Sequence, residues 1–508
     1  MNGRTFWMLT GALISTLTGV LGLRPAHAVV VKEAPWPYVT LPVAEWRAVA
    51  LSTSAADAAT AQQLLKVDDI GLPARDSHGA RIAWVRATAL ADGALSFPAT
   101  PEGTTLYAVM HLHNPLTYRS QAFRFRITGN KRVVLLINGT EVAGRYDAQQ
   151  TFTGDMGSHK IRGMNRIILK VPGGSATTLK VEMTNAGDVR YFSQVPPSFD
   201  LSRHVGDWKT VTISNGLVTA QIAKPDVERG YYRGNRFEQA VTVTHLTYAG
   251  HTYFLAPKPP FTPTGNHRMV GPSEEFFDGI AWDDAKDREP FIKVGVGLFE
   301  KPVKGNNAFN NNYWPVKRFP WKMKARKDQV EFRQVVDGPR GWGYRYIKRL
   351  LLVPGQPCMR LEHEFTNTGT QTITAEQYCH NWVVLDKQPI GKGYSVTFPY
   401  QISTEKDYSK TATITGNRID LLSAETTGVR LGEHTTPSDN TALIRCAGTD
   451  AAIKISGDFP TSAATLYFET EAVCYEPFFK FTLAPGETVK WTRMYEFIAG
   501  EQVKPTQR

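Results

Sequence analysis

Short runs in which apolar and polar residues alternate recur along most of the chain. Residues 131–147 hold two apolar-rich runs joined by Asn138 and Gly139, the dipeptide that most readily adopts the positive φ angles of a two-residue hairpin turn. Residues 165–174 and 177–185 repeat the same rhythm of short strand and turn. An apolar period of two residues is typical of strands, so the first half of the chain is predicted to be mainly β-structure.

The second half of the chain contains longer strand-like runs with no helical period between them. These runs lie at residues 209–223, 239–254, 329–337, 343–353 and 359–369. In residues 321–327 basic and apolar side chains alternate, which is typical of a half-exposed strand. Residues 53–67 are the one segment with helical character. The pattern therefore predicts an all-β protein with a large antiparallel sandwich in its second half.

A segment with two adjacent prolines and no apolar period, residues 192–207, separates the two halves. Such a segment is typical of a linker between domains. The chain of 508 residues also exceeds the size at which a single hydrophobic core stops growing. We therefore expect two domains, an N-terminal jelly-roll β-sandwich at residues 29–200 and a larger β-sandwich at residues 205–508.

The N-terminus combines Arg4, an apolar run at residues 6–23 and small residues at Ala26 and Ala28. This order is typical of a secretory signal peptide, which we predict at residues 1–28. No later segment is long and apolar enough to span a membrane. We expect an exported protein, periplasmic or extracellular, with no membrane span in the mature chain.

The chain is basic, with a formal net charge of +11 that falls to +9 once Arg4 and Arg24 leave with the signal peptide. A basic exported protein could favour an anionic ligand, but such a charge is more often that of an ordinary soluble surface. No glycine-rich phosphate-binding motif follows a predicted strand. We therefore expect no cofactor and no nucleic-acid partner.

A histidine, His380, lies between aromatic and aliphatic residues in the strand-like segment 376–386. A single histidine with such flanks is more often a core residue than a catalyst, so a catalytic role requires a second proton-transfer group. Glu476 has similar flanks, and apolar neighbours on both sides leave a carboxylate poorly solvated and make it a stronger base when it ionises. A glutamate paired with an arginine at the edge of the sandwich is an equally good interpretation.

The chain has four cysteines, all in its second half, and their spacing does not match a zinc site, so we expect no metal ligand. An oxidising compartment would permit up to two disulfides, but buried free thiols or one disulfide are favoured over a redox role. If two strands present His380 and Glu476 to one side, Cys379 points to the opposite face and Cys474 shares the face of Glu476. A disulfide between these two cysteines is therefore not expected.

Three segments of the second half resemble the galactose mutarotase (aldose 1-epimerase) superfamily. Residues 232–254 resemble its arginine-rich opening strand pair, and residues 365–386 resemble the strand that leads to a histidine and an aromatic residue. Residues 475–497 resemble its closing segment, in which a glutamate precedes Leu-x-Pro-Gly-Glu. The resemblance spans roughly residues 208–500 and implies a mutarotase-like β-supersandwich, while residues 29–200 would form a jelly-roll of the galactose-binding-like kind.

The resemblance implies a role for individual residues. His380 would be the general acid, Glu476 the general base and Arg236 a contact to a sugar hydroxyl. A second histidine follows the opening strands in this family, and His267 occupies the corresponding interval. We further expect substrate contacts from Glu275 and Trp382.

The sequence therefore predicts an exported carbohydrate-active protein that performs acid/base chemistry on a sugar ring. Its partner would be a mono-, oligo- or polysaccharide. Three alternatives stay open. The first is a glycoside hydrolase that uses two of Glu274, Glu275 and Glu476. The second is a polysaccharide lyase with Tyr378 beside His380. The third is a glycan-binding protein without catalysis.

Overall fold

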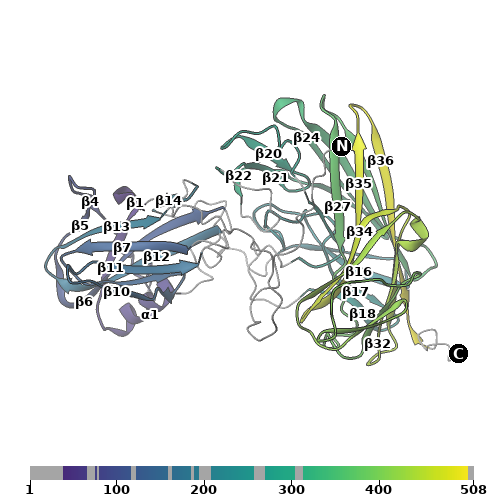
Figure 1. The fold of residues 1–508 in the computed structure, drawn as a ribbon, viewed down its shortest axis with the longest axis horizontal. Coiled ribbons are helices and arrows are strands. Elements are labelled where there is room, and N and C mark those ends of the chain that lie inside the picture. The colour runs from purple at the N-terminus through teal and green to yellow at the C-terminus, as the bar shows by residue number, and fades with distance from the viewer. Residues whose placement is uncertain are drawn as a thin grey trace, which may run out of the picture. The chain divides into compact units, whose positions relative to one another are not determined.

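The structure is a computed structural model. It describes residues 38–65, 72, 75–76, 79–115, 122–157, 163–184, 188–193, 208–256, 269–277, 279–303 and 313–500. Strands dominate these ranges (Figure 1), which confirms the all-β prediction. In the same ranges no helix is both long and apolar enough to cross a membrane. The predicted signal peptide lies outside them and stays a prediction.

The described strands up to residue 192 form two seven-stranded sheets, and all of their pairings are antiparallel. The first sheet contains β1 (Tyr38–Thr40), β4 (Thr88–Ala89), β5 (Leu95–Phe97), β7 (Ala122–Gly129), β10 (Gly144–Tyr146), β11 (Phe152–Gly157) and β13 (Thr177–Thr184). The second contains β2 (Arg47–Leu51), β3 (Val85–Arg86), β6 (Thr100–Asn114), β8 (Val134–Ile137), β9 (Thr140–Glu141), β12 (Gly163–Gly174) and β14 (Arg190–Phe192).

The helix and the hairpin that the sequence predicts in this half are both confirmed. The helix α1 (Ala55–Leu65) buries Leu64 among apolar residues of the second sheet. Strands β8 and β9 pair across a two-residue turn in which Asn138 and Gly139 have φ angles of 50° and 77°. Asparagine and glycine tolerate this left-handed backbone, which is why the turn forms at this dipeptide.

The described strands from residue 210 onward form four further sheets. The four-stranded sheet contains β15 (Thr210–Ser214), β16 (Val218–Ala223), β17 (Val243–Tyr248) and β18 (His251–Leu255), and the three-stranded sheet contains β20 (Pro290–Lys293), β21 (Gly297–Glu300) and β22 (Trp314–Arg318). The five-stranded sheet has the order β19 (Ser273–Phe276), β27 (Ile373–His380), β35 (Ala472–Leu483), β34 (Thr461–Glu469) and β31 (Thr427–His434).

The largest sheet has ten strands among the described residues. Its order is β23 (Lys322–Ala325), β24 (Gln329–Asp337), β25 (Gly343–Leu352), β26 (Cys358–Asn367), β36 (Thr488–Ile498), β33 (Ala452–Gly457), β32 (Thr441–Cys446), β28 (Tyr394–Thr397), β30 (Arg418–Leu421) and β29 (Ala412–Thr415). Three short 3₁₀ helices connect strands in the described ranges, η1 (Val43–Glu45), η4 (Pro339–Gly341) and η5 (Pro437–Asp439).

The five-stranded and ten-stranded sheets pack face to face through aromatic side chains. Phe276 of β19 lies 5.7 Å from Phe365 of β26, and Phe479 of β35 lies 5.3 Å from Trp491 of β36, between ring centroids. These contacts belong to one extended buried cluster. The opposite face of the five-stranded sheet carries a second, smaller apolar cluster that includes Phe237, Tyr378 and Phe478. The candidate site lies on this second face.

Candidate functional site

His380 and Glu476 are cross-strand neighbours on adjacent strands of the five-stranded sheet. The register of β27 and β35 pairs Tyr378 with Phe478, and two further residues along this antiparallel register bring His380 opposite Glu476. Because side chains alternate along a strand, all four project from the same face. The pairing thus joins two segments that are 96 residues apart in the chain.

The two predicted catalytic residues are in direct contact. Nδ1 of His380 lies 2.7 Å from Oε1 of Glu476. The side chains are largely buried, with 6% and 11% of their surfaces exposed. A general acid and a general base on opposite sides of a sugar would have to be separated by the ring. The structure instead holds His380 and Glu476 together as one pair, the dyad, on one side of any ligand.

Three aromatic rings surround the imidazole of His380. The ring centroids of Trp382, Phe237 and Tyr467 lie 4.9, 5.1 and 6.0 Å from that of His380. Trp382, a predicted substrate contact, is buried and packs on His380. The dyad is therefore fixed within an aromatic shell, which restricts the orientations that its imidazole can take.

A thiol also lies next to the imidazole of His380. Sγ of Cys474 lies 4.0 Å from Nε2 of His380, whereas Cys379 on the opposite face contacts Asn381 and Tyr495. The predicted faces of the two cysteines are thereby confirmed. Burial raises the pKa of the Cys474 thiol well above its ordinary value, so this thiol keeps its proton at neutral pH. All four cysteines of the chain are free in the structure.

Arg236 lies beside the dyad on the buried loop between β16 and β17. The strand predicted from residue 239 begins only at Val243. The Nε atom of Arg236 donates to Oε2 of Glu275 at 2.6 Å, and its Nη2 atom donates to the hydroxyl of Tyr378 at 2.5 Å. Burial is the largest single influence and would lower the pKa of Arg236, but the attractions of Glu275, Tyr378 and Glu476 together outweigh burial and the pKa is raised. Arg236 therefore carries a permanent, rigidly held positive charge near Glu476, which also contributes to the raised pKa.

Glu275 anchors this arginine from the neighbouring strand β19. Its carboxylate is fully buried and receives, besides Arg236, the hydroxyl of Tyr378 at 2.6 Å and Nζ of Lys293 at 3.2 Å. The register pairs Glu275 with Tyr378, so both lie on the face of the dyad. With three donors already bound, Glu275 supports Arg236 and has little capacity left for a substrate hydroxyl.

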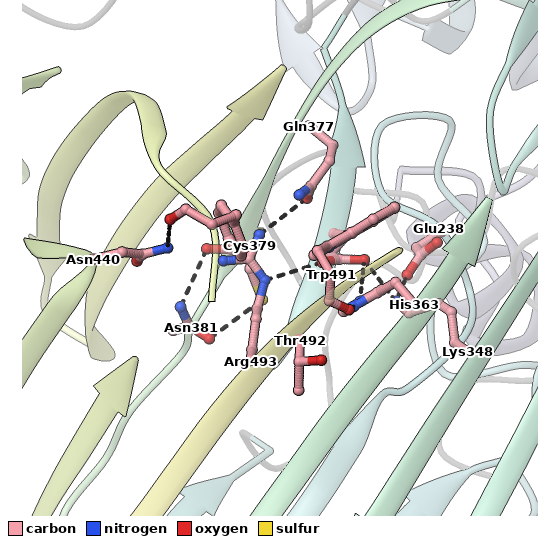
Figure 2. Close-up of polar contacts among 12 residues, drawn as sticks. Glu238, Lys348, His363, Gln377, Cys379, Asn381, Asn440, Trp491, Thr492 and Arg493 are labelled. Atoms are coloured by element: carbon pink, nitrogen blue, oxygen red, sulfur yellow. Dashed lines mark hydrogen bonds and ion pairs between the residues drawn. The ribbon is translucent and has the colours of Figure 1, made fainter. Parts of the chain in front are cut away.

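Glu274, the adjacent carboxylate, projects from the opposite face of β19 into the sandwich. Oε2 of Glu274 lies 2.9 Å from Nζ of Lys348 and Oε1 lies 3.2 Å from Nε of Arg493. Lys348 also pairs with Glu238. Figure 2 shows this buried network, in which Lys348 and Glu238 lie together and Arg493 extends toward Gln377. Glu274 and Glu476 therefore do not face a common ligand.

The network also contains residues that the sequence analysis did not single out. They are Glu238, Lys348, His363 and Arg493, each at most 3% exposed. The alternation of inward and outward positions along a strand could have identified Lys348 and Arg493 as inward-facing residues. Lys348 has the inward parity of Tyr346 in β25, and Arg493 has that of Trp491 in β36.

Not every predicted site residue can be placed. His267 lies outside the described residues, so its predicted role stays a prediction. Within the described part of the chain, no group of three or more His, Cys, Asp or Glu side chains is arranged to hold a metal ion.

Comparisons with known proteins find similarity at the level of structure. No protein-family model and no curated protein match the chain. A galactose mutarotase-like protein from Lactobacillus casei is 13% identical, with a TM-score of 0.36, over 57% of this chain and 100% of that protein. A galactose mutarotase-like protein from Clostridium acetobutylicum is 13% identical over 58% and 96% (TM-score 0.38), and an aldose epimerase homologue from C. elegans is 13% identical over 57% and 99% (TM-score 0.35).

Proposed function

We propose that this protein is an exported carbohydrate-active enzyme that performs acid/base chemistry on a sugar ring, in the manner of an aldose 1-epimerase. The observation that carries the proposal is the 2.7 Å contact between His380 and Glu476, a pair that can hold and release a proton. The sequence resemblance of the segments around Arg236, His380 and Glu476 to the mutarotase superfamily supports the same chemistry.

Opening a pyranose ring requires one proton to leave the anomeric hydroxyl and one to reach the ring oxygen. Both oxygens are bonded to the same carbon, so a proton-transfer pair on one side of the sugar can reach both. Rotation about the adjacent carbon bond, followed by the reverse steps, gives the other anomer. A correctly placed acid/base group typically accelerates such a transfer by about 10²–10⁴-fold.

The surroundings of the dyad suit a sugar. Sugar-binding and other small-molecule sites combine apolar or aromatic walls with a few fixed polar groups. Trp382, Phe237 and Tyr467 supply aromatic surface around His380. Arg236 supplies a fixed positive charge that Glu275 and Tyr378 hold in place.

The alternatives receive less support from the geometry. For hydrolysis, Glu274 faces away from Glu476 and Glu275 is already bound by three donors. For a lyase, Tyr378 would serve as a base, but burial raises the pKa of Tyr378 well above its ordinary value and disfavours the phenolate. A glycan-binding protein without catalysis is an outcome of the experiment below.

The purified protein should interconvert the anomers of at least one sugar in a panel of mono- and oligosaccharides. Anomer exchange is measured by polarimetry and by NMR, and reducing ends and ultraviolet absorbance are read in parallel to detect a hydrolase or a lyase. We expect His380→Ala and Glu476→Ala each to lower turnover by about a hundredfold or more. Circular dichroism checks that both variants keep the fold.

A matched control is His251→Ala. Nδ1 of His251 also lies 2.7 Å from a carboxylate, that of Asp386, but on β18 and outside the dyad. Turnover in this variant should equal that of the unaltered protein. Full turnover in His380→Ala or Glu476→Ala would remove the catalytic assignment, and sugar binding without turnover in the unaltered protein would identify a binding protein.

A further inference from the structure

Both ring nitrogens of His380 already have a neighbour. Nδ1 faces Oε1 of Glu476 at 2.7 Å, and Nε2 faces Sγ of Cys474 at 4.0 Å, within the range of a weak hydrogen bond from a thiol. Cys474 is fully buried and His380 is 5% exposed. Trp382, Phe237 and Tyr467 pack around the ring. The imidazole therefore presents no ring nitrogen to a ligand in this arrangement.

Glu476 differs from His380 in this respect. Only its Oε1 atom is hydrogen-bonded, to His380, and its Oε2 atom makes no hydrogen bond to any residue that the structure describes. The side chain of Glu476 is also more exposed than that of His380, at 11% against 6%. The carboxylate oxygen Oε2 is thus the atom of the dyad that a ligand can reach.

We propose that His380 is a positioning residue. Its Nδ1–H donates to Glu476 and its Nε2 accepts from the thiol of Cys474, so Glu476 alone exchanges a proton with the sugar. This inference rests on the proposed function and assigns the roles within it. The pKa of Cys474 supports the arrangement, because a thiol that keeps its proton can donate to Nε2 and leave the imidazole proton on Nδ1.

One carboxylate can perform both proton transfers of ring opening. The anomeric O–H bond breaks as an O–H bond forms on Oε2 of Glu476, and the electron pair left on the anomeric oxygen forms the carbonyl bond. The bond from the anomeric carbon to the ring oxygen breaks, its electron pair stays on the ring oxygen, and that oxygen takes the proton back from Oε2. Glu476 is ionised again, and no other reactant is needed.

Two substitutions at position 380 separate positioning from proton transfer. The amide nitrogen of asparagine occupies the place of Nδ1, whereas that of glutamine reaches the place of Nε2, and neither amide titrates. We expect His380→Asn to keep turnover within about tenfold of the unaltered protein, and His380→Gln to lose about a hundredfold or more, like His380→Ala. If His380→Asn is as inactive as His380→Ala while folded, His380 itself transfers the proton and the inference is wrong.

The role of Cys474 is tested by Cys474→Ala, which removes the group at Nε2 and leaves the dyad. We expect a loss of turnover of about tenfold at most, together with a changed nitrogen signal of His380, because Nε2 loses its neighbour. A complete loss of turnover in the folded variant would make the thiol a reactant, and an unchanged rate with an unchanged signal would show that Cys474 has no positioning role. Either result overturns the assignment.

A measurement without substrate keeps this inference separate from the proposed function. In ¹⁵N-histidine-labelled protein, the signals of His380 are identified by their loss in His380→Asn, and they should show a protonated Nδ1 and an unprotonated Nε2 at neutral pH. A protonated Nε2 would overturn the inference whatever the activity. If the protein shows the expected spectrum but turns over no sugar, the proposed arrangement of the dyad is supported and only the proposed function is refuted.

Discussion

At the scale of single residues, Glu238 is the buried group with the clearest consequence. Nζ of Lys348 pairs with both Glu238 and Glu274, so one ammonium serves two carboxylates. Burial raises the pKa of Glu238 from 4.5 to about 8, and Lys348 offsets only part of this effect. The pKa of Glu274 is lowered despite burial, because His363, Lys348 and Arg493 surround it. The network therefore holds one ionised and one largely protonated carboxylate near neutral pH.

This difference predicts a pH-dependent stability. Unfolded, Glu238 ionises near pH 4.5, whereas in the fold it keeps its proton up to about pH 8, so the folded state binds more protons across this window. The contribution of Glu238 to stability should therefore fall as the pH rises from about 4.5 to 8, whereas His363, whose pKa burial lowers from 6.5 to about 4, contributes in the opposite direction between about pH 4 and 6.5. Glu238→Gln removes this titration. As the pH rises from about 4.5 to 8, the free energy of unfolding of the variant, relative to that of the unaltered protein, should increase by about 1 kcal/mol or more.

The measurement is urea unfolding at several pH values within the window. Glu331→Gln is the matched control, since Glu331 pairs with Arg349 on the same sheet but is 42% exposed. Exposed pairs contribute little to stability, so this control should follow the unaltered protein. Parallel pH curves for Glu238→Gln and the unaltered protein would contradict the raised pKa.

At the scale of elements, the strands and one tight turn could be predicted from the sequence, but the register between strands could not. The alternating period located strands such as β25, and Asn138 and Gly139 marked the hairpin, because both signals are local. The contact of His380 with Glu476 depends on which residues of β27 and β35 pair, and a shift of one residue would move Glu476 to the opposite face. Their apolar flanks indicated burial and not the 2.7 Å contact.

The limits of prediction are clearest for Glu275 and Glu238. Glu275 has the same-face parity as the dyad, yet sequence alone does not reveal that Arg236 and Lys293 already bind it. Glu238 lies on a buried loop without a strand or helix period, so no pattern marked it as an inward residue. The partners and the burial of both residues depend on contacts between distant segments, which a local sequence pattern cannot reveal.

The hairpin between β8 and β9 gives a prediction at this scale. Gly139 has a φ of 77°, and a Cβ atom there would lie 2.2 Å from the carbonyl oxygen of Leu65 at the end of α1. Gly139→Ala should therefore add the overlap with α1 to the strain of a left-handed alanine, which is about 1–2 kcal/mol. In the control Gly103→Ala, in the same stretch of the chain, φ is 79° and no atom lies within 4 Å, so only the strain applies.

Thermal unfolding of the two variants separates the cost of the overlap with α1 from the strain of a left-handed alanine. Gly139→Ala should lower the melting temperature clearly more than Gly103→Ala does. Equal shifts would mean that α1 moves away from the hairpin at no cost, contrary to its buried contact through Leu64.

At the scale of the whole molecule, the described sheets divide between two stretches of the chain. Two sheets use strands only up to residue 192, and four use strands only from residue 210 onward. The predicted domain boundaries at 29–200 and 205–508 stay a prediction, and the separation of the sheets supports them. A stretch that completes its own sheets has the backbone pairing that independent folding requires.

Residues 205–508 should therefore fold when produced alone. Circular dichroism should show strand content and a cooperative melt, and the dyad variants should behave in this fragment as in the full chain. Aggregation of the fragment under conditions in which the full chain is soluble would place the boundary elsewhere or make the second stretch dependent on the first.

The alternation along β35 separates two tasks at the level of single side chains. Cys474, Glu476 and Phe478 belong to the site, while Tyr475 and Phe479 on the other face of the strand fill the sandwich. Deleting a single residue from this strand would exchange the two sets at once, so β35 should tolerate almost no change in length.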